Sequence, residues 1–62
     1  MTEAQSIPED RRRQIFVALV EAQDQSMTVS ESRILIAQQF SVTETEVRLI
    51  EREGLDNGWP PL

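Results

Sequence analysis

The 62-residue sequence contains no cysteine, histidine, lysine or tyrosine. The lack of cysteine excludes a disulfide framework and a thiolate metal site. The lack of histidine, cysteine and lysine removes the commonest general base, the strongest nucleophile and the amine that forms Schiff bases. The carboxylates that remain do not have the alternating spacing of a calcium-binding loop. We therefore predict that the protein is not an enzyme and has no catalytic residue, metal site or cofactor.

Long apolar runs are also missing. The longest run, Ile15 to Val20, is far shorter than the roughly 20 residues that a membrane-spanning helix needs. The first residues are polar and acidic, unlike a signal or transit peptide. We expect a single domain covering residues 1–62, located in the cytoplasm and not bound to a membrane. Such a small domain buries only about 60% of the surface of its unfolded chain, so its stability depends on every large apolar residue.

Positive charge is scarce, because six arginines stand against eleven carboxylates and the net charge is −5. Residues 14–32 and 53–62 carry carboxylates but no arginine, whereas residues 1–13 and 33–52 are each neutral overall. Nucleic acid repels an acidic protein at long range. Any binding to nucleic acid must therefore come from a local group of arginines.

A helix is predicted near the N-terminus. Ser6 and Glu9 have the spacing of a capping box, and Pro8 is suited to a first helical turn. The helix should run from about Ile7 to Ala22 or a little beyond. Its apolar face is wide, which indicates a helix that lies across two others.

Two further helices follow, each with a capping box at its start. The two boxes are Thr28 with Glu31, and Thr43 with Glu46. The helices should cover residues 29–40 and about 43–56, with a tight turn at Ser41 to Thr43. Asn57 and Gly58 form a natural stop, since both residues tolerate left-handed backbone angles.

These patterns predict an all-α fold, a three-helix bundle with a C-terminal helix-turn-helix at about residues 28–56. Ala37 should be buried, because two helices that cross over a short turn leave room only for a small residue. Gly54 should weaken the third helix by roughly 1 kcal/mol relative to alanine. The predicted core consists of Ile15, Leu19, Ile36, Ala37, Phe40, Val47, Ile50, Leu55 and Trp59.

The segment from Ile36 to Leu55 resembles the promoter-reading helix-turn-helix of bacterial primary sigma factors and, more broadly, of helix-turn-helix transcription regulators. The shared pattern is Ile36-Ala37, Phe40, Val42-Thr43, Val47-Arg48, Ile50-Glu51, Glu53 and Leu55. Ser41 stands where these motifs usually have glycine. Members of this family place the second motif helix in the DNA major groove. The resemblance therefore implies that the helix starting at Thr43 binds double-stranded DNA.

On this interpretation the candidate nucleic-acid-binding residues fall into two groups. Thr43, Thr45 and Arg48 would contact DNA directly. Arg52 and the run Arg11, Arg12 and Arg13 would hold phosphates. The alternatives remain open: Arg48 could pair with Glu44 or Glu51, and Arg52 with the neighbours of Glu51. The arginine run could balance Glu9 and Asp10.

The acidic charge supports a second function, a protein-interaction or adaptor module that keeps the scaffold but does not bind DNA. The first turn of the third helix carries Glu44 and Glu46, which lie unfavourably beside phosphates. The residues that could bind a protein partner are Glu21, Asp24, Trp59, Pro60 and Pro61. The tail from Trp59 could be a proline-rich ligand or could pack on the core. A homodimer is left open under either function.

Overall fold

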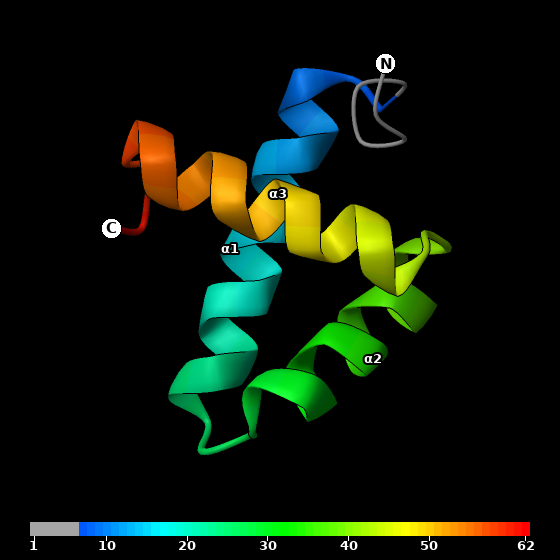
Figure 1. The fold of residues 1–62 in the computed structure, drawn as a ribbon. Coiled ribbons are helices and arrows are strands. Elements are labelled where there is room, and N and C mark those ends of the chain that lie inside the picture. Colours follow the sequence, from blue (N-terminus) through cyan, green and yellow to red (C-terminus); the bar gives the residue numbers. More distant parts are fainter. Residues whose placement is uncertain (1–6) are drawn as a thin grey trace.

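The computed structural model describes residues 7–62, which form three α-helices and no β-strand. α1 spans Glu9–Asp24, α2 spans Val29–Phe40 and α3 spans Glu44–Asn57. In Figure 1, α3 lies across α1, and α2 leads from the end of α1 back to the start of α3. Each helix packs on the other two. None of the described helices has the length and apolar composition needed to cross a membrane.

Capping boxes begin α2 and α3, as predicted. The Thr28 hydroxyl accepts a hydrogen bond from the Glu31 N–H at 3.1 Å, and the Glu31 carboxylate accepts one from the Thr28 N–H at 3.0 Å. Thr43 and Glu46 form the same reciprocal pair, at 3.0 and 2.8 Å. Each box satisfies two backbone N–H groups that have no partner within the helix.

The start of α1 differs from the prediction. The helix begins at Glu9, with Pro8 in the N-cap position at ψ 146° and no side-chain cap. Ile7 lies outside the helix, because a proline disfavours the helical conformation in the residue that precedes it. Its side chain is buried in the core instead. The predicted cap at Ser6 lies outside the described residues.

The capping box of α2 should make stability depend on pH. Hydrogen bonds from the Thr28 backbone and hydroxyl lower the pKa of Glu31 below its ordinary value of 4.5. A carboxylate with a lowered folded-state pKa stabilises the fold above its unfolded-state pKa, and this contribution is lost as the pH falls through the folded-state pKa. Glu31→Ala should therefore destabilise the protein at neutral pH and much less at about pH 3, as measured by urea unfolding at both pH values.

The control for this experiment is Glu21→Ala, which removes one exposed carboxylate from the last turn of α1, where it caps no helix start. A cost of Glu31→Ala that is the same at both pH values would show that the capping carboxylate does not act through its charge.

α2 ends at Ser41, which has the left-handed backbone angle φ 55°. The N–H of Val42 then bonds back to the Ala37 carbonyl at 3.0 Å. This bond closes the helix as a glycine C-cap would. A non-glycine residue in this conformation costs roughly 1–2 kcal/mol, which explains why glycine is usual where a helix ends in this way.

α3 ends at Gly58, also left-handed with φ 63°. The chain then turns back, and the Trp59 N–H bonds to the Gly54 carbonyl at 3.0 Å. The indole is buried and meets the Phe16 ring edge-on, with 6.1 Å between the ring centroids. The packing interpretation of the tail is therefore correct for Trp59.

The core is close to the predicted one, but the prediction omitted Ile7, Phe16 and Ala22 and wrongly included Leu55. Its buried apolar residues are Ile7, Ile15, Phe16, Leu19, Ala22, Ile36, Ala37, Val47, Ile50 and Trp59. Phe40 is only partly buried and packs against them. Leu55 was predicted to be buried and is 58% exposed. Gly54, four residues after Ile50, occupies the inward position instead. Leu55 is the next residue along the helix, so its side chain points away from the core.

Candidate nucleic-acid interface

The outer side of α3 carries the predicted DNA-contacting residues. Thr45, Arg48 and Arg52 are separated by three and four residues, so they lie on one side of the helix, and all three are exposed. The opposite side is buried through Val47 and Ile50. The packing of α3 in the core therefore directs these three side chains to solvent.

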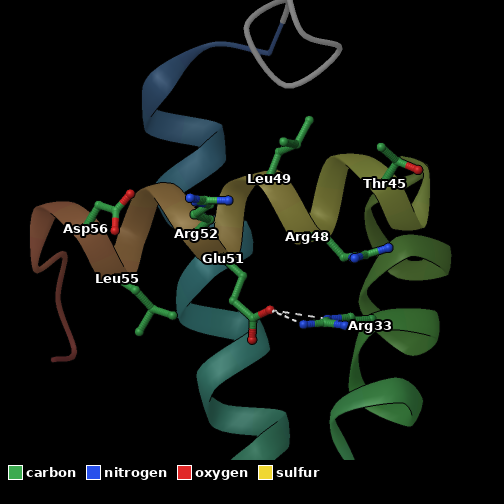
Figure 2. A pocket seen from close by; sticks show the side chains of 8 residues that line it. All are labelled: Arg33, Thr45, Arg48, Leu49, Glu51, Arg52, Leu55 and Asp56. Carbon is green, nitrogen blue, oxygen red and sulfur yellow. Dashed lines mark hydrogen bonds and ion pairs between the residues drawn. The ribbon is translucent and has the colours of Figure 1, made fainter.

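Thr45, Arg48 and Arg52 help to line an open pocket of about 490 Å³ (Figure 2). The rest of the lining consists of Arg33, Leu49, Glu51, Leu55 and Asp56. Three guanidinium groups stand against two carboxylates here, which gives the lining a net charge of +1. A positive surface on a protein with a net charge of −5 is a local exception to its overall electrostatics.

A polar junction at Glu51 joins the three helices beneath this pocket. One carboxylate oxygen of Glu51 accepts from Arg33 of α2, from Nη2 at 2.7 Å and from Nε at 3.2 Å. The other oxygen accepts from Gln23 of α1 at 3.1 Å. Gln23 also lies 3.4 Å from the hydroxyl of Ser32, a fully buried polar residue. The junction fixes the position of Arg33, which the sequence analysis did not include among the site residues.

Arg48 and Arg52 keep their guanidinium groups unpaired. Neither forms an ion pair or a side-chain hydrogen bond with any residue from 7 to 62. The pairing of Arg48 with Glu44 or Glu51, left open by the sequence, is therefore not formed. The carboxylate of Glu51 bonds instead to Arg33 and Gln23.

Thr43, the remaining predicted residue of α3, is its N-cap. Its hydroxyl accepts the Glu46 N–H, and its own N–H donates to the Glu46 carboxylate. Thr43 is exposed at the tip of the turn. Its position at a helix N-terminus would bring it close to any ligand that meets this end of α3.

Arg12 is occupied by an internal ion pair. Its Nε and Nη2 donate to the two carboxylate oxygens of Glu53 on α3, at 2.8 and 3.0 Å. Nη1 donates to the Ile7 carbonyl. The Glu53 carboxylate raises the pKa of Arg12 above its ordinary value. The partner of Arg12 is therefore Glu53 on another helix, and neither Glu9 nor Asp10.

Arg11 and Arg13 also contact the fold. Arg11 donates to the Phe40 carbonyl at 3.0 Å, and its guanidinium lies 5.4 Å from the centroid of the Phe40 ring. Arg13 pairs with Glu9 at 3.1 Å and lies 4.9 Å from the Trp59 ring centroid. Such cation–π contacts stabilise an exposed site by about 0.5–1 kcal/mol. The arginine run thus joins α1 to α2, α3 and the tail.

The residues proposed to bind a protein partner differ in their exposure to solvent. Glu21 and Asp24 are exposed on α1, and Pro60 and Pro61 are exposed in the tail. Trp59 is 4% exposed, so its side chain is not available to a partner. The proline-rich ligand that the sequence left open therefore lacks its aromatic residue.

Within residues 7–62 no cluster of three or more histidine, cysteine or acidic side chains is placed to hold a metal ion. Comparisons of the chain with protein-family models, with curated proteins and with solved structures find no match. The exposed side of α3, with its unpaired arginines and its pocket, is therefore the site from which a function has to be inferred.

Proposed function

We propose that the protein is a small double-stranded DNA-binding module related to transcription, in which α2 and α3 form a helix-turn-helix. α3 enters the major groove with its exposed side. The short connection of residues 41–43 and the buried Ala37 support this arrangement. The short connection and the small buried residue keep α2 and α3 close together and leave one side of α3 exposed. A helix that reads the major groove needs such an exposed side.

The observation that carries this proposal is the unpaired state of Arg48 and Arg52. Carboxylates outnumber arginines in this protein by eleven to six, yet neither arginine forms an ion pair with a residue of the described part of the chain. Here the other four arginines are bound to acceptors within the fold, namely Arg11, Arg12, Arg13 and Arg33. The two that remain lie one turn apart on the same exposed side of α3. Arginine is the residue that most often reads guanine, by two hydrogen bonds in the major groove.

The acidic first turn of α3 opposes DNA binding less than its two glutamates would indicate. The Glu46 carboxylate accepts the capping hydrogen bond from the Thr43 N–H, so it is turned back toward the start of the helix. Glu44 alone is left exposed without such a bond. A carboxylate in the major groove can accept from the amino group of cytosine. Glu44 therefore contributes to sequence selectivity, and Arg48 and Arg52 supply the attraction to DNA.

Fluorescence anisotropy with a labelled mixed-sequence duplex tests this function. The wild-type protein should bind at low salt and lose affinity steeply as salt rises. Arg48→Gln should weaken binding about tenfold or more, because a good arginine–base pair contributes about 1–3 kcal/mol. Arg13→Gln is the matched control, since it removes the same charge from a residue occupied by Glu9 and Trp59.

A second candidate function is a protein-interaction module, and exposed apolar surface favours it. Leu55 is 58% exposed and shares the pocket with Leu49 and Arg48. An apolar side chain beside a cation suits an acidic, partly apolar protein segment better than a phosphate backbone. Absence of DNA binding at low salt, for a protein shown to be folded, would rule out the first function and leave this one.

A further inference from the structure

Two arginines from different helices line the same pocket as Glu51. The guanidinium of Arg33 is fixed there, because both its Nε and its Nη2 bond to the Glu51 carboxylate. Arg48 precedes Glu51 by three residues, so the two lie on one side of α3, with about 5–6 Å between their Cβ atoms. Figure 2 shows the Arg48 side chain extending from α3 toward α2, the helix that carries Arg33. Both arginines line the same pocket.

The charges at this point are not balanced within the fold. Glu51 carries one negative charge and pairs with Arg33, and its other oxygen accepts from Gln23, so the charge of Arg48 is not neutralised by this carboxylate. Arg48 has no ion pair with any described residue. Two like charges near one another repel, and an anion between them removes this repulsion.

We propose that Arg33 and Arg48 together form a phosphate-binding site at the junction of α2 and α3, with Glu51 as the residue that positions Arg33. The Arg33 side chain is 28% exposed and so can be reached by a ligand. Its two hydrogen bonds to Glu51 hold it in one geometry, so it loses little freedom on binding. Its Nη1 makes no bond to a described residue and remains available as a donor. Arg48 supplies the second set of donors.

This inference rests on the proposed function for the source of the phosphate. In a DNA complex the phosphate is a backbone phosphodiester at the edge of the groove that α3 enters. Arg33 then acts as a positioning contact that sets the register of α3 and does not read sequence. The same chemistry would also bind free inorganic phosphate, and the two sources can be separated by experiment.

Inorganic phosphate is the first probe. In two-dimensional NMR spectra, the arginine Nε–H signals of Arg33 and Arg48 should shift together and saturate at one phosphate concentration. In Arg33→Gln, the affinity reported by Arg48 should fall about tenfold or more, because a charge-assisted hydrogen bond is lost. Arg13→Gln should leave both signals and the affinity unchanged, since Arg13 is already bound to Glu9. Far-UV circular dichroism confirms that each variant is folded.

Labelled duplex DNA is the second probe. Arg33→Gln should lower the slope of log affinity against log salt by about 0.9, the loss of one phosphate contact, and should weaken all duplex sequences alike. Arg13→Gln should leave the slope unchanged.

The two probes separate the possible failures. A shared phosphate shift without DNA binding supports the two-arginine site and rules out DNA as the function. DNA binding that Arg33→Gln leaves unchanged in affinity and slope overturns the site and keeps the function. Independent phosphate shifts at Arg33 and Arg48, or no saturable shift at either, also overturn the site.

Discussion

Replacing Trp59 with alanine should remove most of the stability of the protein. Truncation of a buried tryptophan typically costs about 3–5 kcal/mol. Here it removes the edge-on contact with Phe16 and the surface on which Arg13 lies. A domain of this size has a total stability of only roughly 3–9 kcal/mol. Thermal unfolding followed by circular dichroism should therefore show a midpoint that is lowered by about 12–40 °C.

The matched control is Leu62→Ala, in the same tail. Leu62 is 62% exposed, and its truncation should change stability by no more than about 0.5 kcal/mol. If both variants unfold at the wild-type temperature, the tail does not belong to the core.

Gly54→Ala should destabilise the protein by about 2 kcal/mol, although alanine is the better helix former. A Cβ at Gly54 would lie 2.3 Å from Cδ1 of Phe16, which is fully buried and cannot move into solvent. Overpacking of this kind costs about 1–3 kcal/mol, and at such a short distance the upper part of that range applies. The gain in helix propensity, about 1 kcal/mol, offsets only part of the cost. Urea unfolding measures the net change.

A double-mutant cycle with Phe16→Leu identifies the cause. The smaller side chain leaves room for the new methyl group, so Gly54→Ala should cost much less in the Phe16→Leu background. Stabilisation by Gly54→Ala in the wild-type background would mean that α1 and α3 do not pack as closely as described. The sequence alone predicts that stabilisation, because it shows only a glycine inside a helix.

Local signals predicted the helices well. The boxes of Thr28 and Thr43 depend on residues three positions apart, so their spacing in the sequence carries the whole interaction. The left-handed stops at Ser41 and Gly58 are also local. The start of α1 was misplaced because Pro8 was assigned to the first helical turn, whereas it precedes the helix as the N-cap.

Contacts between helices could not be predicted in the same way. Arg12 with Glu53, and Arg33 with Glu51, are far apart in the sequence and share no helical spacing. Their pairing depends on how α1, α2 and α3 cross. The candidate site was therefore predicted only for the residues on α3, and the contribution of Arg33 emerges once the helices are assembled.

Gly54 and Leu55 also show that contacts between helices could not be predicted from the sequence. The sequence favours leucine for the core and treats glycine as a weak point. The close crossing of Phe16 over α3 reverses this assignment, because only glycine fits beneath the ring. Leu55 is left exposed in the pocket that Arg48 also lines, where it is available to a ligand.

Mapping the DNA-binding surface by amide NMR shifts tests the central claim most directly. A short duplex added to labelled protein at low salt should shift the signals of Thr45, Arg48 and Arg52, with Arg33 beside them, and should leave the outer side of α1 unchanged. No shifts on α3, or shifts confined to Glu21 and Asp24, would contradict the proposal that α3 is a DNA-reading helix.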